Sequence, residues 1–102
     1  MGILSWWKKN KPNRIAGSAI LLANSGKYTE ALQKAEEALS LDPDTEMAWA
    51  TKAISYFNTD QPEASLEACK KVLAINPQSS LKDSMVKLME ASAQKLASAG
   101  KA

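Results

Sequence analysis

Few residues of this chain are of a kind that catalyses reactions or holds a metal ion. The sequence contains no histidine, which is the commonest general base and the commonest metal ligand. Its single cysteine, Cys69, cannot form a disulfide within the chain. No nucleophile paired with a base can be assembled from the remaining residues, so we expect no enzymatic activity, no metal site and no cofactor.

Two local patterns that look chemical have a simpler interpretation. The run 25–27, Ser-Gly-Lys, is similar to the end of a phosphate-binding loop. Leu21 stands where that loop needs its first glycine, however, and Tyr28 stands where it needs Ser or Thr. Cys69 falls on the inner side of a predicted helix, where we expect a buried, unreactive thiol.

The composition is that of one folded domain in a reducing compartment. A chain of 102 residues is too short for two independent cores, and 45% apolar with 24% charged residues argues against disorder. No apolar run is long enough to span a bilayer. The first residues lack the order of a signal peptide, because the basic run follows the apolar stretch. We therefore expect a cytoplasmic protein.

Charge is distributed unevenly along the chain. Four of the 13 basic residues and none of the 11 acidic residues lie within residues 1–14. The rest of the chain therefore carries nine bases against 11 acids, although the whole chain has a net charge of +2. Because the folded body offers no basic surface, we do not expect nucleic acid as a partner.

A repeat with a period of 34 residues organises the chain. Leu41-Asp42-Pro43 returns as Ile75-Asn76-Pro77 at this offset. A fixed period of this size is typical of a repeat array, in which each unit buries its apolar face against its neighbours. The same offset pairs Ile15 with Trp49, Ala19 with Ala53, Ile20 with Ile54, Asn24 with Asn58, Ala35 with Cys69 and Leu39 with Leu73.

Turn and cap residues divide the chain into five predicted helices, and no strand signal accompanies them. We expect the first helix over about 14–24 with Asn13 as its N-cap, because Pro12 disfavours helix at Lys11. The fold class is therefore all-α. The other helices are predicted over about 27–41, 45–58, 61–75 and 80–98, with Asp44, Asp60 and Ser79 or Ser80 as N-caps of the last three and Pro62 in the first turn of the fourth.

The residues around these turns resemble the tetratricopeptide repeat (TPR) family over about residues 12–79. The second half of one repeat is matched by the run 26–31, Gly-Lys-Tyr-Thr-Glu-Ala, followed by Ala35, Ala38-Leu39 and Pro43. The next repeat is matched by Trp49, Ala53, Tyr56 and Pro77. The chain departs from the family at Ile15, which replaces a tryptophan, at Lys52, which replaces a leucine, and at Pro62, where the first repeat has Tyr28.

The resemblance implies an α-α superhelix of two helix-turn-helix repeats with a solvating fifth helix. In that division, residues 1–12 are a basic, Trp-containing N-terminal segment and 13–45 form the first repeat. Residues 46–79 form the second repeat, and 80–99 form the capping helix. The cap holds Asp83, Lys87 and Glu90 where repeats carry residues that pack on a second helix, and a charged surface suits an array end.

The resemblance also implies that a peptide or helix binds in a concave groove lined by the first helix of each repeat. We do not expect a site for a C-terminal carboxylate, because Ala16 and Ala50 stand where such sites need polar side chains. An apolar groove is one interpretation, and simple packing of first helix on first helix is the other. The predicted groove residues are Ala16, Ile20, Asn24, Met47, Ala50, Ile54, Phe57, Asn58, Leu81 and Leu88.

Trp6 and Trp7, beside three lysines, form a second distinctive feature. Such a segment can lie at an anionic bilayer surface, where its short length makes attachment weak and reversible. Alternatively, the indole rings fold back onto the open end or groove of the first repeat, which is the interpretation we favour because burial removes much apolar area from water.

The sequence thus predicts a non-enzymatic scaffold or adaptor that binds another protein through its groove. One alternative is a self-assembling structural protein, a homodimer formed through the same apolar surface. The other alternative is a membrane-peripheral module tethered by residues 1–11.

Overall fold

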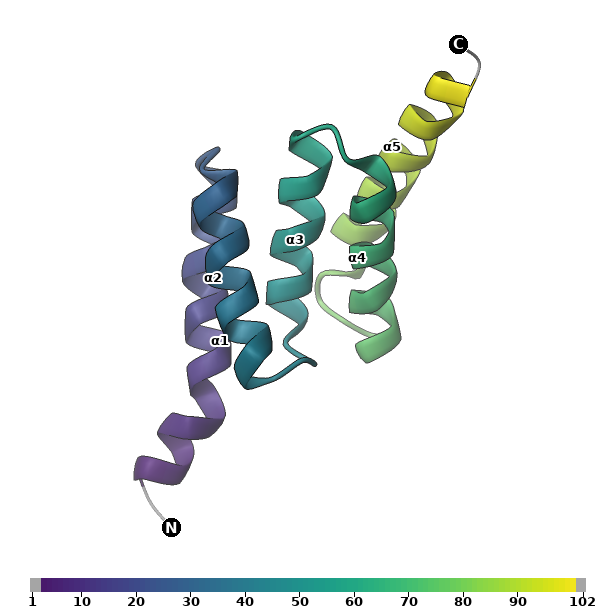
Figure 1. The fold of residues 1–102 in the computed structure, drawn as a ribbon. Coiled ribbons are helices and arrows are strands. Elements are labelled where there is room, and N and C mark those ends of the chain that lie inside the picture. The colour runs from purple at the N-terminus through teal and green to yellow at the C-terminus, as the bar shows by residue number, and fades with distance from the viewer. Residues whose placement is uncertain (1–2, 101–102) are drawn as a thin grey trace.

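The structure is a computed structural model that describes residues 3–100, with side chains described from residue 10 onward. Within this range it is entirely helical, which confirms the all-α prediction. The five helices are α1 (Ile3–Asn24), α2 (Tyr28–Leu41), α3 (Glu46–Asn58), α4 (Pro62–Ile75) and α5 (Lys82–Gly100). Figure 1 shows them as successive hairpins, with the two chain ends at opposite corners of an elongated molecule.

The helices pack in the order of a helical repeat. Each helix contacts the next one in sequence, and α3 also contacts both α1 and α5. First helices therefore lie against first helices, as in a superhelix of stacked repeats. Within the described range, α1 and α5 do not contact each other, so both flank α3 on one face without closing over it.

Small side chains form the core between the helices. One cluster consists entirely of alanines that are fully buried. Because an alanine projects only a methyl group, the helix axes can approach toward the lower end of the usual range of about 8–10 Å. This close approach lets the stacked helices exclude water without large residues. The alanines are Ala16, Ala19, Ala35, Ala38 and Ala48.

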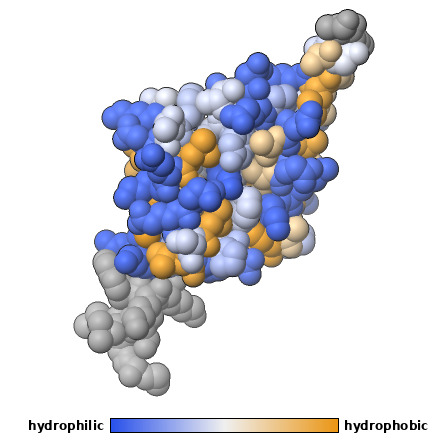
Figure 2. Space-filling view, in the orientation of Figure 1, coloured by the Kyte–Doolittle hydropathy of each residue, from blue (hydrophilic) through white to orange (hydrophobic). Residues whose placement is uncertain are grey.

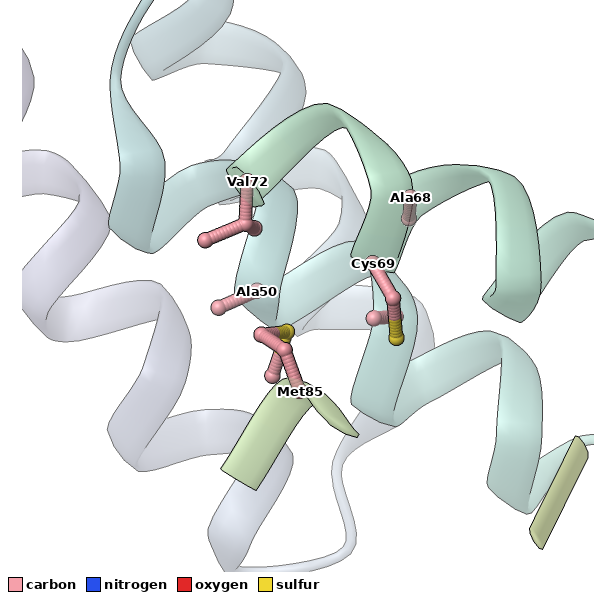
Figure 3. Close-up of a cluster of buried hydrophobic side chains, with 6 residues drawn as sticks. Ala50, Ala68, Cys69, Val72 and Met85 are labelled. Atoms are coloured by element: carbon pink, nitrogen blue, oxygen red, sulfur yellow. The ribbon is translucent and has the colours of Figure 1, made fainter. Parts of the chain in front are cut away.

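A second cluster joins α3, α4 and α5. In Figure 3, Ala68, Cys69 and Val72 extend from α4 toward Ala50 on α3 and Met85 on α5. Met85 is only 1% exposed and is the largest fully buried side chain of the described residues. Its burial anchors the last helix to the second repeat.

The face of the array on which α2 and α4 lie carries many polar residues. Figure 2 views the side on which α2 and α4 lie, where hydrophilic residues are interrupted by several apolar patches. The exposed residues of these helices include Glu36, Glu37, Glu67, Lys70 and Lys71. They serve as a solvated surface.

The predicted start of the first helix is wrong. α1 begins at Ile3 and runs through Pro12, so Asn13 is not its N-cap. The bias of a residue before proline away from helix is a preference, and tertiary packing overrides it here. Pro12 is buried, and that burial offsets part of the cost of about 3 kcal/mol for a proline inside a helix.

Two predicted N-caps are also displaced by one residue. Thr45, not Asp44, occupies the cap position of α3, and its Oγ1 donates a 2.7 Å hydrogen bond to the carbonyl oxygen of Asp42. The backbone N–H of Asp44 instead donates to Asp42 Oδ1 at 2.9 Å. Gln61, not Asp60, precedes α4.

The last two helices begin one or two residues later than predicted, at Pro62 and Lys82, but two of the predicted start residues lie at these helix starts. Pro62 lies in the first turn of α4, as predicted. Before α5, Ser79 Oγ accepts a 3.1 Å hydrogen bond from the backbone N–H of Leu81. Of the two serines proposed as the cap, Ser79 is therefore the one that binds backbone at this helix start.

The turn between the helices of each repeat needs left-handed backbone. Gly26, in the α1–α2 turn, has a φ of +83°. Asp60 holds the same place one repeat later with a φ of +62°. Glycine adopts this conformation freely, and aspartate tolerates it better than most residues do. The chain reversal is thus encoded similarly in both repeats.

Substituting the two internal glycines by alanine should have opposite effects. A Cβ atom at Gly26 or at Gly17 would meet no neighbouring atom within 4 Å, so backbone conformation alone decides the outcome. Gly26→Ala should destabilise the fold by about 1 kcal/mol, because an alanine is strained at positive φ. Gly17→Ala, inside α1, should stabilise it by about 0.5–1 kcal/mol. Urea unfolding followed by circular dichroism measures both, and changes of equal sign would show that backbone conformation does not govern these two positions.

Burial controls the chemistry of the one thiol. Cys69 is 0% exposed, and desolvation raises its pKa from 9.0 to about 11, against the opposing effect of its hydrogen bond with Ser65. Ser65 Oγ also donates a buried 2.8 Å hydrogen bond to the carbonyl oxygen of Ala53, which ties α4 to α3. The thiol is therefore a neutral, unreactive part of the core, as predicted from its position.

The raised pKa of Cys69 makes stability depend on pH. Below pH 9 the thiol is neutral in both folded and unfolded chains. Between pH 9 and about 11 only the unfolded chain loses the thiol proton. The free energy of unfolding therefore falls as the pH rises. The stability of wild type relative to Cys69→Ala should drop by about 2 kcal/mol across this window. Chemical denaturation of both proteins at several pH values measures the difference, in which contributions that both proteins share cancel. A constant difference would show that the thiol is not shielded.

Candidate functional site

An apolar surface runs across α1, α3 and the start of α5. Ile20 on α1 and Ile54 on α3 occupy equivalent places in the two repeats, and Leu88 on α5 follows one period later. All three side chains are half-buried. We call this surface the inner face, and it comprises Ile20, Met47, Ile54, Phe57, Leu81 and Leu88, which are all half-buried.

The remaining predicted groove residues lie below or beside the inner face. Ala16 and Ala50 are 0% exposed and belong to the core beneath it. Asn24 and Asn58 are exposed at the last residues of α1 and α3. The side-chain Nδ2 of Asn58 donates a 2.8 Å hydrogen bond to the carbonyl oxygen of Ile54 within its own helix. The apolar members therefore dominate this surface.

Packing accounts for part of the inner face. Ile20, Leu81 and Leu88 contact the cluster around Met85, so each contributes to the stacking of first helices. Each nevertheless keeps a part of its side chain open to solvent. Helix packing and an apolar groove are therefore compatible. One side of each of these residues packs inward, and the other side is exposed to solvent.

A lysine covers the inner face at one end. Lys95 Nζ lies 4.1 Å from the centre of the Phe57 ring and donates a 3.3 Å hydrogen bond to the Phe57 carbonyl oxygen. The pair joins α5 to the last turn of α3 through a cation–π contact and a helix C-terminal bond. Beside it, a cleft of about 700 Å³ opens between the α3–α4 turn and the second half of α5.

Carboxylates gather at the other end. A cavity of about 350 Å³, which we call the acidic pocket, is lined by residues from the middle of α1, the α2–α3 connection, the first turn of α3 and the α4–α5 connection. Met47 and Leu81 of the inner face line it, so the pocket is continuous with that surface. No basic residue is among its described lining residues, which are Asn13, Asp42, Asp44, Thr45, Glu46, Met47, Ser80 and Leu81.

Two of the three carboxylates that line the pocket accept hydrogen bonds from nearby residues. Asp42 Oδ1 accepts from the Asp44 backbone N–H, and Glu46 Oε2 accepts from Asn76 Nδ2 at 3.4 Å. Asp42 and Asp44 are exposed, whereas Glu46 is half-buried. These acids and Lys95 are absent from the predicted groove. Three acids within residues 42–46, at the start of a first helix, are the sequence signal that could have identified the pocket.

Lys52, one of the three residues that depart from the family pattern, lies at the junction between the repeats. Lys52 forms an ion pair with Glu36 across α3 and α2, and its ammonium lies 4.7 Å from the centre of the Trp49 ring. Trp49 Nε1 donates a 2.8 Å hydrogen bond to the Pro43 carbonyl oxygen. Lys52 thus replaces an apolar contact with an ion pair and a cation–π contact, and α2 and α3 remain packed together.

The N-terminal tryptophans lie on the first turns of α1. Figure 1 shows these turns projecting past the neighbouring helices, because the backbone of residues 3–9 continues α1. The side chains of Trp6 and Trp7 are outside the described part of the structure. Among the described residues, no helix is long and apolar enough to cross a membrane. No group of three or more His, Cys, Asp or Glu residues that could hold a metal ion occurs there either.

Comparison with known proteins identifies the repeats. The chain matches the family described as tetratricopeptide repeat over residues 22–88, which is more than half of its length. No curated protein matches the chain. Domains of this family generally mediate protein–protein interactions and are typically non-enzymatic scaffolds. The matched span covers α2, α3 and α4 together with parts of α1 and α5, and the helical packing agrees with it. The chain belongs to the tetratricopeptide repeat family.

Proposed function

We propose that this protein is a non-enzymatic scaffold or adaptor whose inner face binds a peptide or helix of another protein. The observation that carries the proposal is the open arrangement of α1 and α5, which flank α3 without contacting each other. A row of half-buried apolar side chains extends across these three helices. Such a row is the usual surface for an amphipathic helix or an extended hydrophobic peptide.

The chemistry of the inner face favours an apolar ligand. Its middle holds Ile20, Ile54 and Leu88, and the buried alanines below them offer no polar group. Charged side chains lie at its ends, with Lys95 at one end and the acidic pocket at the other. A ligand would therefore gain affinity from apolar burial along its length and orientation from charges at its ends. A reducing cytoplasm suits this role, because Cys69 needs no disulfide partner.

Substituting Ile54 by aspartate should abolish binding without unfolding the array. The change places a carboxylate in the middle of the apolar row, where a bound apolar partner would desolvate it, and we expect at least a roughly tenfold loss of affinity. Leu21→Asp is the matched control, because Leu21 is 67% exposed and is not one of the inner-face residues.

The measurement is an affinity pull-down with the intact chain and both variants, with circular dichroism to verify helix content. Proteins retained by wild type and by Leu21→Asp, but lost by Ile54→Asp, would support the inner face as the binding surface. If Ile54→Asp retains the same proteins as wild type and its helix content is unchanged, the inner face is not the binding surface.

A further inference from the structure

The first turns of α1 and the acidic pocket are complementary in charge. Residues 3–11 contain three lysines and no acid, whereas Asp42, Asp44 and Glu46 line the pocket. We propose that this segment of one copy occupies the acidic pocket and adjoining inner face of a second copy, which returns the contact. A reciprocal exchange of this kind gives a closed two-fold dimer. The inference rests on the binding role proposed above for the inner face.

Geometry directs the segment toward a second copy. Residues 3–11 continue α1 as helix, and Figure 1 shows these turns leading away from the array. Asn13, which follows this segment on α1, lines the acidic pocket, so segment and pocket lie at the same end of the molecule. A helix of this length is about 14 Å long and does not turn back on itself. The segment therefore does not reach its own pocket while it stays helical, and a second copy facing this end can receive it.

The segment also has the apolar content that the inner face requires. Ile3, Trp6 and Trp7 follow the i, i+3, i+4 spacing that places residues on one helix face. Two tryptophans bury on the order of 300–500 Å². Reciprocal exchange doubles this to about 600–1,000 Å², close to the smallest area of about 1,000–1,200 Å² seen in specific interfaces, before other contacts are added.

Electrostatics at the pocket favour a cationic occupant. The N-termini of α3 and α5 lie at this end, and each contributes about half a positive charge through its dipole. Three carboxylates outweigh this contribution by about two negative charges, so the pocket attracts lysines. The same end of a second copy supplies Lys8, Lys9 and Lys11.

Charge exchange between two variants of the full chain tests the proposal. The first variant, Lys8→Glu/Lys9→Glu, reverses the segment, and the second, Asp44→Lys/Glu46→Lys, reverses the pocket. Each variant alone places like charges at both contacts, so we expect dimerisation to weaken about tenfold or more relative to wild type. An equimolar mixture restores opposite charges at both contacts of a mixed dimer, and the dimer should return.

Sedimentation velocity over a range of concentrations measures these equilibria. Asp83→Lys/Glu90→Lys, on the exposed surface of α5, is the control with the same change in charge and should dimerise like wild type. If Asp44→Lys/Glu46→Lys loses its helical signal, Asp44→Lys alone replaces it, because Asp44 is exposed.

Three results would overturn the inference. They are a wild type that stays monomeric up to millimolar concentration, a mixture that stays as weak as its components, and a control that weakens equally. A monomer that binds vesicles of anionic phospholipid would assign the segment to a membrane surface instead. If the wild type is monomeric and binds another protein that the Ile54→Asp variant does not bind, the proposed function stands and only the dimer is overturned.

Discussion

Close packing of helices through small side chains is the constraint on which the rest of this structure depends. The buried alanines leave no room for larger groups between α1, α2 and α3, and the helices stack at short distance as a result. Substituting any of them by a larger residue would force the helices apart. The spacing of the inner-face residues follows from this stacking, because each first helix is fixed relative to the next.

The array also ends in a way that leaves a surface open. Met85 seats α5 against α3 and α4, while α5 keeps its distance from α1. Because no further helix follows in the described range, the charged outer side of α5 faces solvent, and the apolar inner face remains partly exposed between α1 and α5. The packed sides of these helices therefore stabilise the array, and their partly exposed sides form the surface for which we propose a binding role.

Much of this fold could be predicted from the sequence, because its period of 34 residues repeats small residues, turns and prolines together. The number of helices and the buried Cys69 followed from that pattern, and Pro62 at the start of α4 followed from the preference of proline for the first turn of a helix. The start of α1 could not be predicted, since a local rule for residues before proline cannot register that Pro12 becomes buried in the array. The caps at Thr45 and Gln61 differ by one residue from the predicted ones because alternative hydrogen bonds within the turns compete.

The candidate site was predicted less completely than the fold. Periodicity placed Ile20, Ile54 and Leu88 on one side, but it could not distinguish surface residues from the alanines directly beneath them. Contacts between residues far apart in sequence, such as Lys95 with Phe57 or Glu46 with Asn76, carry no periodic signal. The charges that close the two ends of the inner face therefore became apparent only in three dimensions.

Methyl NMR spectroscopy tests most directly whether the inner face is the surface that binds protein. The resonances of Ile20, Ile54 and Leu88 should shift when a binding protein is added or when the chain itself is concentrated. Those of Leu21 and Val86, which are exposed elsewhere, should remain in place. Shifts confined to Leu21 and Val86, with the inner-face methyl groups unchanged, would contradict the account.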